Sequence, residues 1–368
     1  MSSAPPHRPA RKAASRPGRR AAQGPAPVNL ALQGGGSHGA FTWGVLDALL
    51  EDGSLELAGL SGTSAGAMNA AVLACGLARG GRDGAREALR SFWACLSGQA
   101  QAFGPAPDLP AMNAMNLGGT PGLAQFNLDA NPFFGWINAW LGLFSPYQFN
   151  PLNLNTLRDV LSAHVSDVEL QNLPTPLYVT ATSVRTGQPR VFSGQGLSVD
   201  ALMASACLPQ LFQAVQIEGE PFWDGGFVGN PSLWPLFETG VADIVLVQLD
   251  PLLRKDTPDT AVEITDRLNE ITFNASLTAE MRAIHFVQKL AAQGHLPEGY
   301  LVPRLHRIAD DEALAPLTAS SKYNTDGRFL TELFALGRAA AQRWLAGDRR
   351  QVGQVQGCDI ARVYLDPR

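Results

Sequence analysis

Cysteine is scarce in this sequence, and the few cysteines present form no motif. The 368 residues include four, Cys75, Cys95, Cys207 and Cys358, and no two of them stand in a C-x-x-C pair. This scatter argues against a disulfide framework and against a zinc site, because both need cysteines at defined spacings. Neither an HExxH motif nor an EF-hand carboxylate pattern occurs. We therefore expect free thiols of a reducing compartment, and neither a metal nor another cofactor.

Charged side chains are also few, at 17% of the chain, whereas glycine and proline number 37 and 26. An apolar fraction of 45% is ordinary for a folded protein, so this balance indicates many loops around a large apolar core. The net charge of −5 is unevenly spread, because residues 1–27 carry six basic side chains and no acidic one. The remaining chain is therefore more acidic than the whole, which argues against a nucleic-acid partner.

Long apolar runs are absent, since no stretch of 18 or more apolar residues occurs, and the sequence predicts no membrane-spanning helix. Residues 1–27 also lack the apolar stretch of a secretory signal, and we predict a disordered basic leader. The Arg19-Arg20 pair leaves a twin-arginine signal open, and the arginine-rich composition leaves a mitochondrial transit peptide open. We expect a cytoplasmic protein, and export or import through one of these signals is the alternative.

Strand-like and helix-like segments alternate along the chain. Short, largely apolar segments typical of strands lie at 28–33, 55–61, 177–184 and 243–249, and the more polar segment 304–309 is a candidate for a late strand. Helical patterns lie at 40–50, 65–77, 85–96, 156–165, 199–207, 263–293 and 329–345. Because most of the strand-like segments are largely apolar, the pattern predicts an α/β fold with a mainly parallel sheet covered on both faces. Ligands of such sheets bind at the carboxyl ends of the strands.

The pentapeptide Gly62-Thr63-Ser64-Ala65-Gly66 fits the G-x-S-x-G pattern between a predicted strand and a predicted helix. The pattern suits a serine nucleophile, because small neighbours let the chain turn sharply and expose Oγ. The N-terminus of the following helix favours negative charge near the serine. We therefore expect Ser64 to be a nucleophile and the N–H of Ala65 to be an oxyanion donor. An ordinary glycine-rich turn capped by serine is the alternative.

A glycine-rich loop, GGGSHG at 34–39, follows the first predicted strand. Its glycines allow backbone N–H groups to approach a bound anion closely. In a hydrolase, the N–H groups of Gly35 and Gly36 would form an oxyanion hole. The loop also fits G-x-G-x-x-G, so a nucleotide-binding oxidoreductase is the alternative. That alternative needs an acidic residue at the end of the next strand, where the chain instead turns into GTSAG.

Asp224 is followed by Gly225 and Gly226 and preceded by the aromatic pair Phe222-Trp223. An acid in a glycine turn beside aromatic side chains is placed like a general base in an apolar cleft, where burial raises its pKa. Taken alone, a DGG sequence is more often a plain turn. Its interpretation as a base depends on the other two motifs.

A Ser–His–Asp triad is the competing assignment. The chain order Ser64, Asp224 and then His285, His295 or His306 suits an α/β-hydrolase. However, none of these histidines stands in a motif, and the run around His285 is helix-like. We expect them to be ordinary surface or core residues.

In their order, GGGSHG, GTSAG and DGG resemble the patatin-like phospholipase family, as does the stretch ASACLP at 204–209. The resemblance covers roughly residues 28–250, and three ordered motifs are far more specific than one. It implies a three-layer α/β/α sandwich and a Ser64–Asp224 dyad without a catalytic histidine. The residues that match the family's oxyanion loop are Gly34, Gly35, Gly36 and Gly39.

One position departs from that family pattern. The family usually carries arginine or lysine before the last glycine of the oxyanion loop, whereas this sequence has His38. A histidine is cationic only below its pKa, near 6.5 when unperturbed. We expect His38 to be a neutral residue that shapes the turn, and a pH-sensitive site is the alternative.

The resemblance divides the chain into a basic leader (1–27), a patatin-like catalytic domain (28–250) and a mostly helical part (251–368) packed on the same domain. The catalytic domain contains an aromatic-rich insertion near 98–150. Its aromatic residues between 131 and 149 are Phe133, Phe134, Trp136, Trp140, Phe144, Tyr147 and Phe149. We expect an acyl-binding wall, a lid or an interfacial anchor with peripheral membrane contact, and a buried core helix is the alternative.

The function that the resemblance implies is hydrolysis of lipid-like carboxylic esters through an acyl-enzyme on Ser64. If an alcohol or thiol replaces water in the second step, the same residues make an acyltransferase. A catalytically inactive scaffold of the same fold is a further alternative. The intact Ser64 and Asp224 argue against it.

Overall fold

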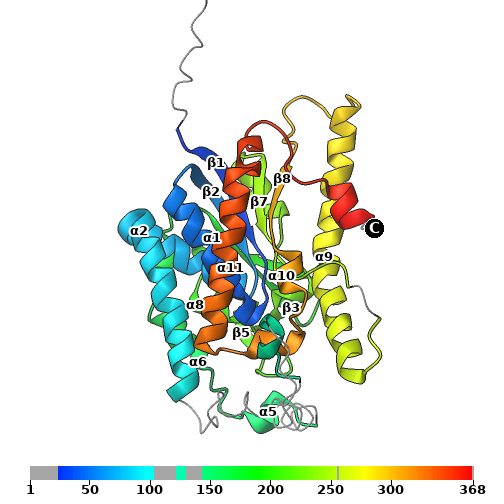
Figure 1. Cartoon of the computed structure of the whole chain (residues 1–368). Helices are drawn as coiled ribbons and strands as arrows, with labels where there is room; N and C mark the ends of the chain where they lie inside the picture. The colour runs from blue at the N-terminus through cyan, green and yellow to red at the C-terminus, as the bar shows by residue number, and fades with distance from the viewer. Residues whose placement is uncertain (1–23, 103–121, 130–142, 255–256, 367–368) are drawn as a thin grey trace, which may run out of the picture.

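The computed structural model describes residues 24–102, 122–129, 143–254 and 257–366. Most of the predicted leader and the segment 131–142 lie outside these ranges. The strands form one eight-stranded sheet in the order β5-β6-β3-β2-β1-β7-β8, and β4 pairs with β3 (Figure 1). In the described ranges, no helix is both long and apolar enough to cross a membrane.

The sheet has a parallel centre and an antiparallel extension. The strands are β1 (Ala26–Leu32), β2 (Leu55–Gly62), β3 (Leu177–Ser183), β4 (Pro189–Phe192), β5 (Val215–Ile217), β6 (Glu220–Asp224), β7 (Asp243–Val247) and β8 (Arg304–Ile308). β3, β2, β1, β7 and β8 are neighbours that run parallel, whereas β4, β5 and β6 pair antiparallel. The mainly parallel sheet is confirmed. The antiparallel strands escaped prediction because they have only 3 to 5 residues and little apolar pattern.

The helices are α1 (Gly39–Asp52), α2 (Ala65–Ala102), α5 (Pro146–Phe149), α6 (Thr156–Ser162), α7 (Asp167–Gln171), α8 (Val199–Ser205), α9 (Ala261–Ala292), α10 (Asp311–Leu314) and α11 (Gly327–Ala346). The longer helices lie at the predicted segments, whereas the short helices α5, α7 and α10 were not predicted. α2 joins two helices that the sequence predicts separately. Non-helical backbone angles at Gly80 and Gly81 mark the break between them.

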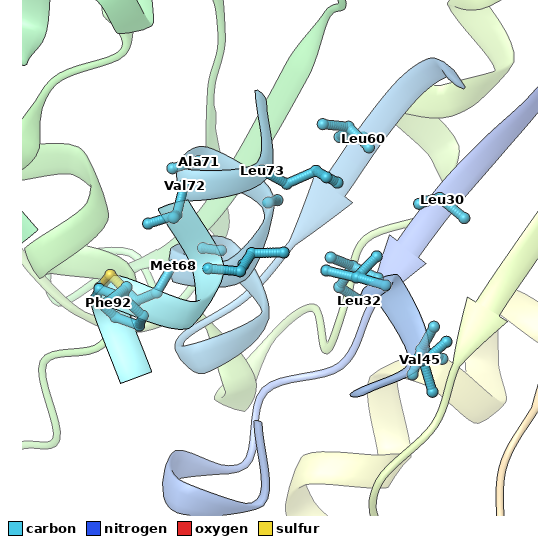
Figure 2. Packing of buried hydrophobic residues seen from close by; sticks show 14 of the residues in the cluster. Leu30, Leu32, Val45, Leu60, Met68, Ala71, Val72, Leu73 and Phe92 are labelled. Carbon is cyan, nitrogen blue, oxygen red and sulfur yellow. The ribbon is translucent and has the colours of Figure 1, made fainter. Parts of the chain in front are cut away.

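Strand β1 shows how the sheet separates two apolar cores. Leu30 and Leu32 face one core, and Ala31 faces the other, because successive side chains of a strand point to opposite faces. The first core is closed by α1, α2, α8 and α11. Figure 2 shows Leu30 and Leu32 of β1 in this core with Met68 and Leu73 of α2.

The second core lies between the sheet and α9, which contributes the buried side chains of Leu277 and Met281. Helices therefore cover both faces, and the fold is the three-layer α/β/α sandwich that the resemblance implies. β1 and β2 pair with Leu32 opposite Gly62, so both strands leave the sheet at the same edge. This common edge positions the two glycine motifs next to each other.

Candidate functional site

Ser64 stands on the sharp turn between β2 and α2. Its backbone φ is 54°, in the left-handed region that a serine rarely adopts. The N–H of Gly66 donates to the carbonyl of Thr63 at 2.8 Å, and that of Met68 donates to the carbonyl of Ser64 at 3.1 Å. The helix thus begins directly after the serine, with Gly62 before the turn. This is the strand–turn–helix arrangement that exposes a nucleophilic hydroxyl.

Ser205, at the end of α8, holds this turn in place. Its buried hydroxyl accepts a hydrogen bond from the N–H of Ser64 at 2.9 Å and donates to the carbonyl of Thr180 at 2.6 Å. The sequence did not predict this role, because the two serines are 141 positions apart. The two serines come together only in the folded chain.

The glycine-rich loop lies directly against the Ser64 turn. A Cβ atom on Gly34 would stand only 2.8 Å from Cβ of Ser64, so no larger residue fits there. The N–H of Gly34 donates to Oδ1 of Asn230 at 2.7 Å, which removes it from the set of available oxyanion donors.

Three other N–H groups belong to the glycine loop and the Ser64 turn. Those of Gly35, Gly36 and Ala65 make no hydrogen bond with other described residues. The glycine loop continues into η1 (Gly36–His38) and then into α1, whose first residue is Gly39. Gly39 packs closely against Ala65, so the loop and the serine turn share one surface.

Asp224 ends β6 and caps η4 (Gly225–Phe227). Its Oδ1 accepts the N–H of Gly226 at 2.7 Å, and its carbonyl accepts the hydroxyl of Thr182 at 2.6 Å. Its own N–H donates to the carbonyl of Cys207 at 2.8 Å. These bonds fix the carboxylate on the turn that the DGG sequence predicts.

The carboxyl group of Asp224 is only 1% exposed, and this burial raises its pKa to about 6. The N–H of Gly226, the hydroxyl of Ser64 and the charge of Lys322 lower the pKa in part. Oδ2 is buried and has no hydrogen-bond partner among the described residues. The hydroxyl of Ser64 nevertheless lies near enough to the carboxylate to lower its pKa. A carboxylate with this pKa is suited to accept a proton near neutral pH.

Two hydroxyl groups fasten the Ser64 turn to the segment after Asp224. The hydroxyl of Thr63 donates to the carbonyl of Gly229 at 2.6 Å, and that of Ser61 donates to the carbonyl of Ser232 at 2.5 Å. Together with the Gly34–Asn230 bond, these contacts bring all three motifs to one place. The structure thus assembles Ser64, Asp224 and the glycine loop into one candidate site.

His38 is buried in η1 and makes a 2.8 Å contact between Nε2 and the hydroxyl of Ser321. Burial lowers its pKa well below 6.5, and the nearby charges of Lys322 and Arg254 lower it further. All three effects favour the neutral imidazole. The direction of this shift agrees with the expectation that His38 is a neutral loop residue.

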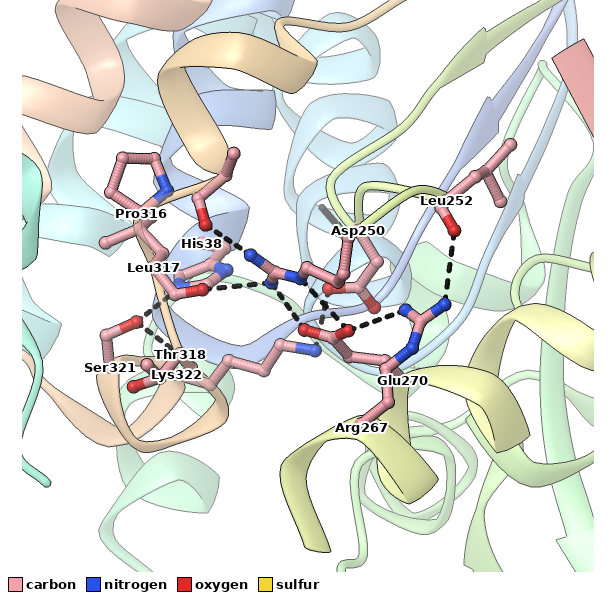
Figure 3. A network of polar contacts seen from close by, with 12 residues as sticks. His38, Asp250, Leu252, Arg267, Glu270, Pro316, Leu317, Thr318, Ser321 and Lys322 are labelled. Atoms are coloured by element: carbon pink, nitrogen blue, oxygen red, sulfur yellow. Dashed lines mark hydrogen bonds and ion pairs between the residues drawn. The ribbon is translucent and has the colours of Figure 1, made fainter. Parts of the chain in front are cut away.

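A network of charged side chains lies beside His38 (Figure 3). Glu270 of α9 pairs with Arg267 at 3.0 Å and also with Arg254. Lys322 pairs with Asp250 at 2.8 Å. Sequence reasoning missed this network, because its members come from the part of the chain after the third motif and carry no motif of their own.

The histidines considered for a triad lie elsewhere. His306 of β8 is buried, and its Nε2 contacts Asp243 at 2.8 Å. His285 is half-buried on α9, and His295 is exposed after that helix. Among the described residues, no hydrogen bond links any of the three to the candidate site, and no cluster of three or more histidine, cysteine or carboxylate side chains is arranged to hold a metal.

Two bacterial proteins of solved structure are similar to the chain. VipD from Legionella pneumophila is 14% identical with a TM-score of 0.36, and the match covers 84% of this chain and 67% of VipD. Full-length ExoU, in its complex with SpcU from the type III secretion system of Pseudomonas aeruginosa, is 16% identical with a TM-score of 0.27. That match covers 87% of this chain and 54% of ExoU. No curated protein matches the chain.

The family comparison is more direct. Residues 30–237 match the model of the patatin-like phospholipases, and this range contains the glycine loop, Ser64 and Asp224. The match spans more than half of the chain and confirms the resemblance of the three motifs. The chain belongs to the family of patatin-like phospholipases, which are lipid acyl hydrolases.

Proposed function

We propose that the protein is a serine hydrolase of carboxylic esters in lipids, with Ser64 as nucleophile and Asp224 as general base. The observation that carries this proposal is the meeting of Ser64, on a left-handed turn, with the buried carboxyl of Asp224. The glycine loop supports it, since Gly34 lies against the serine and leaves neighbouring N–H groups available.

The proposed reaction has two halves. Asp224 takes the proton of Ser64 while Oγ attacks the ester carbonyl carbon. The N–H groups of Gly35, Gly36 and Ala65 stabilise the negative oxygen of the tetrahedral intermediate. The intermediate then expels the alcohol, which leaves with the proton from Asp224.

Water completes the reaction. It loses a proton to Asp224 as it attacks the acyl-enzyme, and the carboxylic acid leaves as Ser64 regains a proton. One base serves both halves because its pKa of about 6 lets it be charged before each attack and protonated after it. No histidine is required in this scheme.

An apolar surface supports a lipid substrate. The interfacial patch comprises the exposed side chains of Leu143, Phe144, Tyr147, Leu152 and Leu154. The segment is fastened to the loop after α8, since Gln213 donates to the carbonyl of Asn150 at 2.9 Å. Exposed apolar side chains gathered in one short segment are candidates for lipid or protein contact. We propose that this patch touches a lipid surface peripherally, as the aromatic segment 131–149 predicts.

Active-site labelling tests the proposed dyad. Wild-type protein treated with a fluorophosphonate should gain one adduct, mapped to Ser64 by peptide mass spectrometry. Ser64→Ala and Asp224→Asn should each lower ester turnover by roughly 10³-fold or more, while Ser97→Ala serves as a serine control on α2. Labelling at another residue, or full turnover in Ser64→Ala, contradicts the proposal.

The acyltransferase alternative is separated by product analysis. Adding a lysolipid or a simple alcohol to the reaction should leave free fatty acid as the main product of a hydrolase. Transfer of the acyl group to the added alcohol as the dominant outcome would assign the transferase activity instead. The dinucleotide alternative has no support at the end of β2, where Gly62 stands in place of an acid.

A further inference from the structure

The oxyanion loop contains no fixed cation of its own, because the pKa of His38 lies well below 6.5. A lysine from a distant part of the chain contacts this loop instead. Lys322 lies in η6 (Ala319–Tyr323), and its carbonyl oxygen occupies the place where a Cβ atom of Gly36 would stand. Gly36 has a φ of +56°, which also favours glycine, so the backbone of Lys322 and the loop fit together closely.

The side chain of Lys322 is held in a defined position. Its Nζ pairs with Asp250 at 2.8 Å and lies 5.9 Å from the ring centre of Phe273, in a cation–π contact. The side chain of Lys322 is 19% exposed, and that of Asp250 is 4% exposed. An ammonium group in such a shielded place acts more strongly on its neighbours than one in open solvent.

Phe273 connects this ammonium to the turn of the proposed base. The ring edge of Phe273 lies so close to Gly226 that a Cβ atom on this glycine would collide with the ring. The N–H of Gly226 in turn donates to the carboxylate of Asp224. Lys322 therefore contacts the oxyanion loop through its backbone and the wall of the Asp224 turn through its side chain.

We propose that Lys322 is a positioning residue that supplies the fixed positive charge of this site, favouring the ionised form of Asp224 and a negative oxygen at the glycine loop. The inference rests on the proposed function. The charge of Lys322 lowers the pKa of Asp224, which burial raises, and it also lowers the pKa of His38.

Two arginines also lie near His38, and the charge of Arg254 lowers the pKa of His38, but the cation that lowers the pKa of Asp224 is Lys322. Arg254 and Arg267 share Glu270, and Arg254 also donates to the carbonyl of Leu317 at 3.1 Å, so both guanidinium groups are engaged beside His38.

Three further titratable groups lie near Asp224 or its neighbours, and each is uncharged or negative in its two protonation states. The pKa values of Cys207 and Tyr323 are raised by burial and by the charge of Asp224, and that of Asp266 is raised to about 6 by burial and by Asp129. None of these groups is cationic. The effect of Lys322 is reduced by its partner Asp250, which makes the expected shift moderate.

The pH dependence of kcat/KM for a soluble ester, 4-nitrophenyl butyrate, tests the inference. In Lys322→Met, the midpoint of the acidic limb should move up by about half a pH unit to one pH unit, below the shift of a directly paired cation. Lys322→Arg should keep the wild-type midpoint. Lys289→Met removes a charge from the exposed far end of α9 and should leave the midpoint unchanged.

Removing the partner anion gives the opposite sign. Asp250→Asn leaves Lys322 uncompensated, so the midpoint should move down. The double variant Lys322→Met with Asp250→Asn avoids an unpaired buried carboxylate, and its midpoint should lie above that of Asp250→Asn alone. A midpoint does not depend on the fraction of folded enzyme, so partial unfolding of one variant does not obscure the result.

The outcomes separate this inference from the proposed function. Suppose that Ser64 reacts with the fluorophosphonate, but that Lys322→Met leaves the midpoint unchanged both in the wild-type chain and in Asp250→Asn. The role of Lys322 is then refuted and the dyad stands. An equal shift in Lys289→Met also refutes it, because the effect is then one of net charge. If Ser64 does not react at all, the proposed function itself fails.

Discussion

The N–H of Gly34 donates to the side-chain oxygen of Asn230 at 2.7 Å, and both groups are buried. This bond joins the oxyanion loop after β1 to the segment after Asp224, across 196 positions of sequence. The Nδ2 of Asn230 is buried without a hydrogen-bond partner in the described part of the chain. The bond to Gly34 is therefore the one polar contact of this side chain, and it orients the loop beside Ser64.

We predict that Asn230→Ala lowers kcat by about 10- to 100-fold, less than the roughly 10²- to 10³-fold lost on removing an oxyanion donor, because the donor N–H groups remain in the loop. It should also lower the free energy of unfolding by about 1–3 kcal/mol, because the N–H of Gly34 is left buried without a partner. Asn230→Asp keeps the acceptor but adds a negative charge beside the loop, so its kcat should fall further. Steady-state kinetics and urea unfolding measure both effects. Wild-type kcat in Asn230→Ala would show that the bond does not position the loop.

The central part of the fold was predictable from sequence for a physical reason. Strands buried on both faces, such as β1 and β7, are largely apolar, and helices such as α11 keep a regular apolar face. The strand–turn–helix around Ser64 followed from small residues at defined spacing. These are local signals, which a single sequence contains.

The supporting contacts were not predictable, because they join distant positions through polar groups of ordinary type. Ser205 holds the Ser64 turn, and Lys322 contacts Gly36, yet neither stands in a pattern that marks such a role. The sequence identified which side chains carry the proposed chemistry. The fold decides which side chains orient them.

A stability prediction follows from the raised pKa of Asp224. The pKa is about 6 in the folded chain and about 3.9 in the unfolded chain. The native state therefore binds the proton more tightly. The stability from this protonated carboxyl is fully present below pH 4 and is lost as the pH rises through 6. At pH 8 the charged, buried carboxylate destabilises the fold by about 3 kcal/mol, an order-of-magnitude value.

Asp224→Asn should remove this penalty, because the amide oxygen can still accept the N–H of Gly226 and the side chain carries no charge. We expect the variant to be nearly inactive and more stable than wild type at pH 8, with the difference vanishing near pH 4. Urea unfolding at both pH values measures it. Equal stability of the two proteins at pH 8 would mean that Asp224 is not destabilised by burial.

The interfacial patch gives a prediction about surfaces. Leu152 and Leu154 are 79% and 72% exposed, so replacing both with glutamate should leave the fold and the hydrolysis of a soluble ester intact. Binding to phosphatidylglycerol vesicles should fall by about 10-fold or more, since apolar contact is lost and the added carboxylates repel the anionic lipid. Glutamates in place of Leu268 and Ile271 on α9, at 59% and 51% exposure, are the matched control. Co-sedimentation measures binding. An equal loss of binding in the control would contradict a specific role of the interfacial patch.

The acidic limb of the pH–rate profile could arise from titration of Asp224 or of His38. The structure shifts the pKa values of these two groups in opposite directions. The pKa of Asp224 is raised to about 6, whereas that of His38 is lowered well below 6.5 by burial and by the charges of Lys322 and Arg254. His38 is therefore neutral across the working range. Its imidazole serves as a hydrogen-bonding partner of Ser321.

We predict that His38→Gln keeps activity within about threefold of wild type and keeps the limb near pH 6, because a glutamine can bind the hydroxyl of Ser321 without titrating. His38→Arg should instead lower the melting temperature, because it adds a buried cation next to Lys322 and Arg254. The pH profile of kcat/KM for His38→Gln decides the assignment. Disappearance of the limb between about pH 6 and 7 in that variant would transfer it from Asp224 to His38 and make the histidine a pH switch.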